Sequence, residues 1–166
     1  MRLIRTADIA DLPALTAIYN HYIVHTPITF DVQPYEPEQR RPWFEDHAPA
    51  GRHRLLVAEE DGAAAGYAST SRWRPKPAYE TTVESSVYVR ADAVGRGIGR
   101  DLYAALFDAM ANEDVHTVVA GVALPNPASI ALHERFGFRH VGVFRDVGRK
   151  FGKYWDVAWF QRSWGA

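Results

Sequence analysis

The sequence predicts one α/β (α+β) domain over residues 1–166, in which strand patterns and helix patterns alternate along the chain. Its length fits a single domain, and an apolar fraction of 47% is ample for one core. The middle of the chain, Thr82–Met110, joins an alternating strand, a glycine-rich turn and an amphipathic helix. We expect the other elements to be arranged around this central segment.

The N-terminal part of the chain carries the patterns of strands separated by helices. Asp8 or Asp11 can cap a helix, because Pro13 suits a first turn and apolar residues then recur at helical spacing. Glu60-Asp61-Gly62 is typical of a tight turn between two antiparallel strands. The expected elements are a strand at Arg2–Arg5, that first helix, a short helix within Glu38–His47, and strands at Arg54–Glu59 and Ala64–Ser71.

The C-terminal part of the chain predicts three strands and one short helix. Gly137 follows the helical pattern at the position where a left-handed residue commonly ends a helix. The expected elements are a strand at His116–Leu124, a helix at Ala128–Phe136, and strands at Phe138–Asp146 and Lys153–Gln161 joined by a loop over 147–152.

The composition excludes several classes of site and partner. A net charge of −1 argues against a broad nucleic-acid-binding surface. The absence of cysteine excludes disulfides, thiolate metal sites and a cysteine nucleophile. The first residues lack the apolar segment of a signal peptide, and no apolar run reaches membrane-spanning length. We expect a cytoplasmic protein with no metal and no nucleic-acid or membrane partner.

The turn after the central strand has the features of a phosphate-binding loop. Glycines let the backbone approach a ligand, the helix start presents free N–H groups, and two arginines add positive charge. A P-loop is excluded because GxxxxGK[ST] does not occur, and a Rossmann fingerprint because the spacing is GxGxG in mid-chain. An ordinary strand-to-helix turn is the alternative. The loop residues are Gly95, Arg96, Gly97, Ile98, Gly99 and Arg100.

Two other clusters of polar and aromatic residues lie outside this segment. Arg72–Tyr79 combines cations, prolines and aromatics just before the central strand, so it is either a solvated basic loop or a stiff anion-binding segment. Tyr19 and Tyr22 lie on the first helix, where they either pack in the core or line a pocket near the helix end.

Two segments resemble motifs of the GNAT (GCN5-related N-acetyltransferase) superfamily. VYV-x4-GRGIGR before an amphipathic helix resembles the motif whose loop holds the pyrophosphate of acetyl-CoA, with Val94 in place of the usual Gln or Arg. Asn126–Phe138 resembles the second motif, N-x-x-[AS]-x-x-L-[YH]-x-x-x-G-F. In it, Asn126 is either a simple helix cap or a ligand of the pantetheine arm. His133 is either structural or the general acid near the departing sulfur.

Further segments between Ile18 and Gln161 are similar to the phosphinothricin acetyltransferase branch, also described as L-amino acid N-acyltransferases. They include IYNHY, RPKPAY, TVE-x-SVYV and VGRKFGKYWDV, in which Tyr154 replaces a common Trp and puts the substrate size in doubt. The resemblance implies the GNAT acyl-CoA N-acyltransferase fold, a mixed, mostly antiparallel sheet flanked by helices, with a splayed central strand. It also implies transfer of an acetyl group from acetyl-CoA to the α-amino group of a small anionic amino acid.

The same resemblance assigns roles to individual residues. Glu84 becomes the general base, since an amino-acid amine is largely protonated at neutral pH and must lose a proton before attack. The strand residues Val87, Tyr88 and Val89 would offer N–H groups to the cofactor and to the thioester oxygen. The residues expected around the amino acid are Phe30, Arg74, Lys76 and Tyr79, with Lys150 and Phe151 closing the site from the last loop.

The resemblance also implies a homodimer, because the branch is usually dimeric. An aromatic-rich C-terminal segment, with Trp155, Trp159, Phe160 and Trp164, would supply a covered surface. The enzymatic alternative is the same chemistry on another amine, such as a different amino acid or an arsenic analogue. The alternative of another class is a non-catalytic CoA-binding sensor, which would need neither Glu84 nor His133.

Overall fold

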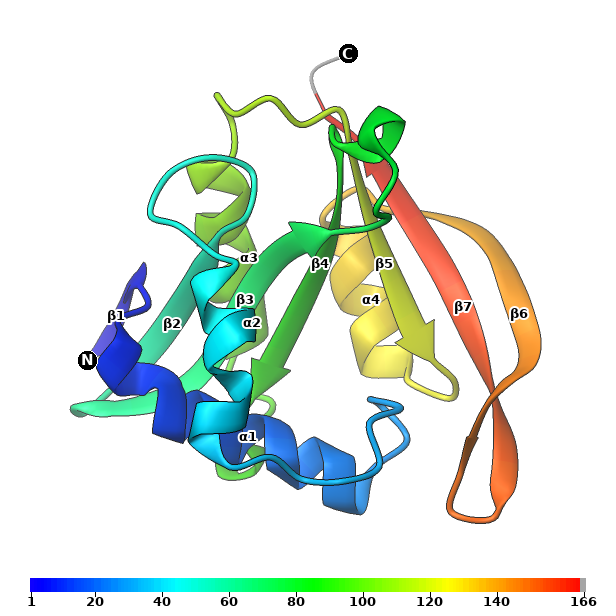
Figure 1. Ribbon diagram of the computed structural model, residues 1–166, viewed down its shortest axis with the longest axis horizontal. Coiled ribbons are helices and arrows are strands. Elements are labelled where there is room, and N and C mark those ends of the chain that lie inside the picture. Colours follow the sequence, from blue (N-terminus) through cyan, green and yellow to red (C-terminus); the bar gives the residue numbers. More distant parts are fainter. Residues whose placement is uncertain (165–166) are drawn as a thin grey trace.

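The computed structural model describes residues 1–164, which form one seven-stranded sheet with helices on both faces (Figure 1). The strands are β1 (Arg2–Thr6), β2 (Leu55–Glu60), β3 (Ala63–Arg72), β4 (Thr82–Val89), β5 (Thr117–Ala123), β6 (Arg139–Lys150) and β7 (Lys153–Ser163). Their order is β1-β2-β3-β4-β5-β7-β6, and every neighbouring pair is antiparallel except β4–β5. The predicted mixed, mostly antiparallel sheet is therefore confirmed.

Alternating residues of β2 show how the helices divide between the two faces. Leu55 and Val57 pack in one cluster with residues of α1, whereas Leu56 and Ala58 pack in another with residues of α3. Successive strand side chains point to opposite faces, so α1 and α3 cover opposite sides of the sheet. In Figure 1, α1 and α2 lie in front of the sheet and α3 and α4 behind it. The helices are α1 (Leu12–His25), α2 (Arg41–Glu45), α3 (Ile98–Ala109) and α4 (Pro127–Arg135).

The central helix α3 is buried more completely than the sequence predicts. Ile98, Leu102 and Leu106 face the sheet as expected, but Tyr103 and Phe107 are also almost fully buried. They contact the α4 side, where Phe107 packs against Phe136 with ring centroids 5.5 Å apart. α3 thus has two buried stripes, one on the sheet and one toward α4.

The two parallel strands pair over a short length and then separate. Only Thr82–Glu84 of β4 pairs with Thr117–Val119 of β5, although both strands continue. β4 keeps its pairing with β3 as far as Val89. The backbone edge of residues 85–89 that faces β5 therefore has no strand partner, and Figure 1 shows β4 and β5 diverging there. This confirms the splayed central strand.

Element boundaries agree with the predictions to within a few residues, with one larger difference. Asp8 caps a single 3-10 turn, Ile9–Asp11, and α1 begins at Leu12. The loop expected over 147–152 is wrong, because β6 continues to Lys150 and only Phe151-Gly152 connect it to β7. Both turn residues have positive φ (54° and 73°), the geometry of a two-residue hairpin turn that twists with the strands.

The C-terminal aromatic residues also differ from the prediction. Phe160 is 2% exposed and belongs to the core. Trp155, Trp159 and Trp164 are partly buried, and the Trp164 ring lies 5.4 Å from that of Phe107. These four residues therefore do not form an exposed surface. The exposed apolar side chains of the last two strands and their turn are instead Val141, Phe144, Val147, Phe151 and Tyr154. Within residues 1–164, no helix is long and apolar enough to cross a membrane.

Candidate functional site

The separation of β4 and β5 creates a narrow opening at the centre of the sheet. Side chains on the α3 and α4 face of β4 alternate with those on the α1 and α2 face, so the opening is accessible to groups from both. A small cavity of about 50 Å³ lies at this point. Its walls are Ile28, Ser85, Ser86, Val87, Tyr88, Tyr103, Gly121, Val122, Ala123, Asn126, Ser129 and His133.

The glycine loop ends in uncapped backbone N–H groups at the start of α3. The first intrahelical bond runs from Asp101 N–H to the Gly97 carbonyl at 3.1 Å, so the N–H groups of residues 98–100 precede it. Gly97, the N-cap, has φ = 78° and provides no side-chain cap within the described chain. Such a set of amides, with the positive end of the helix dipole, suits a phosphate group.

The arginines of the loop border these amides without covering them. The side chains of Arg96 and Arg100 are 53% and 52% exposed, and they pair with Glu60 and Asp101 respectively. Arg2, which the sequence analysis did not single out, contacts Asp101 and donates to the Arg96 carbonyl at 2.9 Å. Arg2 of β1 therefore holds the glycine loop in place through a contact between parts of the chain that are distant in sequence.

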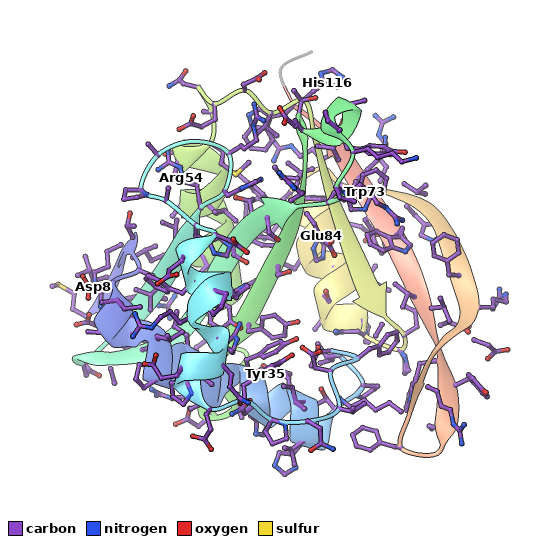
Figure 2. All side chains as sticks on the ribbon, viewed as in Figure 1. Asp8, Tyr35, Arg54, Trp73, Glu84 and His116 are labelled. Atoms are coloured by element: carbon purple, nitrogen blue, oxygen red, sulfur yellow. The ribbon has the colours of Figure 1, made fainter. Side chains whose placement is uncertain are left out.

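Glu84 lies on the other face of β4, in the middle of the sheet (Figure 2). Its side chain is partly buried, and burial raises the pKa of its carboxyl above the ordinary value, while the charge of Arg74 opposes the shift. Among residues 1–164, no side chain donates a hydrogen bond to the Glu84 carboxylate. A carboxylate with a raised pKa and free oxygens is suited to accept a proton.

His133 is buried behind β4 with both ring nitrogens occupied. Nδ1 lies 2.7 Å from the Ser129 carbonyl oxygen, which can only accept, so we assign the proton to Nδ1. Nε2 then accepts from the Tyr103 hydroxyl at 3.1 Å, and that hydroxyl lies 3.3 Å from Ser85 Oγ. Burial also lowers the pKa of His133. The ring is therefore a neutral acceptor in a Ser85–Tyr103–His133 chain, of which the sequence analysis found only the last member.

Asn126 combines the two roles that the sequence left open. Its Oδ1 accepts from Ser129 N–H at 3.1 Å and so caps α4. Its side-chain N–H₂ group remains available, and the residue lines the opening between the strands. Asn126 is therefore the N-cap of α4, and its amide N–H groups remain free to bind a ligand.

The basic segment lies at the rim of the site, near Glu84. Arg74 is exposed and stacks on Trp73, with its guanidinium carbon 5.0 Å from the ring centroid. Tyr79 packs edge-on against the same Trp73 at 5.1 Å and is 41% exposed. Lys76 is exposed and precedes the 3-10 turn Pro77–Tyr79. Arg74 thus acts on Glu84 through its charge, whereas Lys76 has no described contact that directs it toward the site.

Phe30, expected to line the amino-acid pocket, and Lys150 and Phe151, expected to close it, lie in three different environments. Phe30 covers Gly148 so closely that no side chain larger than that of glycine would fit beneath the Phe30 ring. Lys150 is 5% exposed, and its ammonium donates to the carbonyls of Thr26 and Thr29 at 2.7 and 2.8 Å. Lys150 therefore anchors the segment after α1, while Phe151 at the hairpin turn is 56% exposed.

The tyrosines of α1 serve both purposes that the sequence left open. Tyr22 packs against Tyr88 and donates from its hydroxyl to the Val89 carbonyl at 2.5 Å. Tyr19 also packs edge-on against Tyr88, with ring centroids 5.2 Å apart, and lines a second, larger cavity on this face. Core packing and pocket lining therefore occur together.

Comparison with known proteins identifies the family. A family model described as an acetyltransferase (GNAT) domain matches residues 4–159. The phosphinothricin N-acetyltransferase of Streptomyces coelicolor is 59% identical over 154 residues, 92% of this chain and 90% of that protein. The L-methionine sulfoximine/L-methionine sulfone acetyltransferase of Pseudomonas aeruginosa is 39% identical over 158 residues, 95% of this chain and 92% of that protein.

The same family is found among solved structures. The structure of yncA from Salmonella typhimurium, determined with its cofactor acetyl-CoA, superimposes with a TM-score of 0.95 at 37% identity and covers 100% of this chain and 95% of that one. Together with the splayed β4–β5 pair and the uncapped loop before α3, these matches show that the chain belongs to the GNAT family of acetyltransferases.

Proposed function

We propose that this protein transfers the acetyl group of acetyl-CoA to the α-amino group of phosphinothricin, methionine sulfoximine or a similar amino acid. The observation that carries the proposal is the opening between β4 and β5, which has the uncapped amide loop on one face and Glu84 on the other. The names of the relatives from Streptomyces and Pseudomonas supply the substrate class.

On the α3 and α4 face, the chain offers backbone groups for the cosubstrate. The amides of Gly95–Arg100 would hold the pyrophosphate, and the amide of Asn126 the pantetheine arm. The edge of Val87–Val89 that faces β5 has no strand partner, so it would take the arm as an added strand neighbour, and an N–H group there would donate to the thioester oxygen. Acetyl-CoA supplies the acyl group as an activated thioester.

On the α1 and α2 face, Glu84 would remove the proton that makes the amine unreactive. The amine nitrogen then forms a bond to the acyl carbon, the carbon–sulfur bond breaks, and the electron pair leaves on the sulfur. His133, proposed from the sequence as the general acid, would act on this step by holding the Tyr103 hydroxyl, because the proton on its own Nδ1 is bonded to the Ser129 carbonyl. The sulfur would then take its proton from the Tyr103 hydroxyl, which recovers one from solvent, or directly from water. Arg74, Lys76, Tyr79 and Phe30 would surround the amino acid at the rim.

A thiol-release assay tests the proposal directly. The protein contains no cysteine, so a thiol reagent reports only the CoA released from acetyl-CoA. Acetylation of phosphinothricin, methionine sulfoximine or methionine sulfone in preference to other amines supports the function. Binding of acetyl-CoA without release for any amine would instead support the non-catalytic sensor, and preference for an unrelated amine would support the other enzymatic alternative.

We also propose that the protein forms a homodimer. Within residues 1–164, the last hairpin exposes Val141, Phe144, Val147, Phe151 and Tyr154, a set of apolar side chains that a second copy would cover. Sedimentation velocity should give the mass of two chains, and substitution of Phe144 and Tyr154 by Ser should shift it toward one. A wild-type mass equal to one chain at every concentration would contradict the dimer. The expected cytoplasmic location and the expected absence of a metal remain predictions.

A further inference from the structure

The second cavity on the α1 and α2 face extends away from Glu84 and has unusual walls. Its volume is about 250 Å³. It lies between the sheet and the segment that joins α1 to α2, and Figure 2 shows Tyr35 of that segment on the α1 side of Glu84. Tyr19, Asp31, Tyr35, Gln39, Arg40, Trp43, Tyr67, Ser69, Ser71, Ser86 and Tyr88 line it.

Arg40 is a buried cation on the wall of this cavity. It is 6% exposed, and its guanidinium carbon lies 4.4 Å and 3.8 Å from the ring centroids of Tyr19 and Trp43. Its one hydrogen bond within the described chain is a long one, 3.4 Å, from Nη1 to the Leu15 carbonyl. No carboxylate of residues 1–164 forms a salt bridge with it, although a buried arginine is normally paired with an opposite charge.

The hydroxyl of Tyr67 is a second polar group without a partner on the same wall. Tyr67 is 1% exposed, and its hydroxyl makes no hydrogen bond to any described residue. Burial raises the pKa of Tyr67 to about 12, whereas the charge of Arg40 and the approach of its guanidinium to the hydroxyl act in the opposite direction. Both groups are donors, so the contact between them leaves the Tyr67 O–H and the remaining Arg40 N–H groups without an acceptor. A buried hydroxyl left unpaired is unfavourable, which makes two such neighbouring groups a signal of a missing acceptor.

The strand register places these groups in line with Glu84. On this face of the β3–β4 pair, Ser71 lies opposite Glu84, Ser69 opposite Ser86, and Tyr67 opposite Tyr88. Successive rows on one face are about 7 Å apart, because each residue advances the strand by about 3.3 Å. The cavity floor therefore runs from Ser71, the strand neighbour of Glu84, past Ser69 and Ser86 toward Arg40. The distance between Glu84 and Arg40 would be filled by an acceptor amino acid in an extended conformation together with the lengths of these two side chains.

We propose that Arg40 and Tyr67 form the subsite for the oxygen-bearing head group at the end of the acceptor's side chain. The inference rests on the proposed function, which places the acceptor's amine at Glu84. The guanidinium would donate to a phosphinate, sulfone or sulfoximine oxygen, the Tyr67 hydroxyl would donate to a second one, and the serines would complete the shell. Asp31, which accepts from Tyr19, would disfavour an anion placed on its own side of the cavity.

Arg40→Met is the main test, because Met keeps length and apolar contact with Tyr19 and Trp43 but has no donor. We compare kcat/KM for phosphinothricin with kcat/KM for methionine, which has the same α-carbon groups but no head-group oxygen. In the variant, the ratio of the two should fall by about 10- to 100-fold. An equal fall for both substrates would mean that Arg40 is a brace or holds the α-carboxylate, and would overturn the inference.

Tyr67→Phe is the second variant and protects the test against misfolding, because it deletes only the unpaired oxygen. The same ratio should fall by about three- to tenfold, and the melting temperature should not decrease, since no hydrogen bond is lost. An unchanged ratio in both folded variants would overturn the subsite.

Direct binding separates this inference from the proposed function. Calorimetric titration of phosphinothricin into wild type, Arg40→Met and Tyr67→Phe needs no turnover. Loss of affinity in both variants would support the subsite even if no acetylation occurred, and the function alone would then fail. Acetylation by wild type together with equal affinity in all three proteins would leave the function standing and reject the subsite.

Discussion

The two faces of β4 offer different kinds of groups to the proposed ligands. On the α3 side, the Gly95–Arg100 loop offers main-chain N–H groups whose positions follow from one short segment. On the α1 side, Glu84 of β4, Ser69 and Tyr67 of β3, and Arg40 of the segment before α2 come from three elements, and they offer side-chain groups. Under the proposed function, local backbone geometry would serve acetyl-CoA, the part of the reaction common to the family, and long-range side-chain packing would serve selection of the amine.

This difference predicts that mutations on the two faces of β4 change different kinetic constants. Changes in the loop should affect acetyl-CoA, and changes near the cavity should affect the acceptor or the proton transfer. Variants that mix these effects would break the comparison.

The largest effect is expected for Glu84→Gln, which keeps the shape of the side chain but cannot accept a proton. Since general-base catalysis contributes about 10²- to 10⁴-fold, kcat at neutral pH should fall by about that factor. Acetyl-CoA affinity should be little changed because Glu84 lies on the opposite face. Steady-state kinetics with both substrates measure the two constants, and near-wild-type kcat would place the base elsewhere.

The pH profile sharpens this first prediction. Burial raises the pKa of Glu84, so the acid limb of kcat/KM should lie above the ordinary range of a glutamate and disappear in Glu84→Gln. The variant should regain part of its activity at high pH, where the free amine is abundant. The amine's own ionisation produces a similar limb, and acceptors of different amine pKa separate the two, since only the substrate limb moves with them.

The next effect is expected for Gly97→Asp, compared with Gly97→Asn. Asp and Asn have nearly the same shape, and both tolerate the positive φ of 78° better than other residues. Only Asp adds a negative charge beside the proposed pyrophosphate. We expect the affinity for acetyl-CoA, measured by calorimetry, to be about tenfold or more weaker in Gly97→Asp than in Gly97→Asn. Equal affinities in the two folded variants would contradict the assignment of the loop.

The same contrast explains what the sequence predicts and what it does not. The loop, the cap at Asn126 and the buried face of α3 were predicted, because glycines, capping residues and helical periodicity act over a few neighbours. The extent of β6 was not, because its pairing with β7 overrides the turn-like composition of residues 147–152.

The partners of the site residues were missed for a related reason. Tyr103 has the spacing of an ordinary helix residue, and only the packing of α3 against α4 brings its hydroxyl to His133. Arg40 lies in a charged run that is typical of a solvated surface, yet its guanidinium is enclosed by aromatic rings from two other elements. The sequence gives no local signal for such contacts.

A smaller effect is expected from the exposed cations at the rim. Replacing both Arg74 and Lys76 by Ala should raise the acceptor's KM by about three- to tenfold, because solvent and salt screen exposed charges. The KM for acetyl-CoA should stay nearly constant. The effect should shrink at high salt, and Arg135→Ala, at an exposed position of α4, serves as the control. An equal change in both KM values would remove the two cations from the acceptor side.

The smallest effect concerns stability, and its sign follows from the pKa of Glu84. Burial raises the folded-state pKa of this carboxyl above its unfolded value. The protonated form therefore stabilises the fold at low pH, and this contribution is lost as pH rises through the unfolded and then the folded pKa. At neutral pH, the buried charge makes wild type less stable than Glu84→Gln, which is neutral throughout. Melting temperatures should show the variant ahead at pH 7 and the difference vanishing below the unfolded pKa. Arg74 opposes the shift by its charge, so Arg74→Ala should widen the difference. A variant less stable than wild type at pH 7 would mean that the carboxylate is well accommodated on the acceptor face, and the contrast with the neutral amides of the other face would fail.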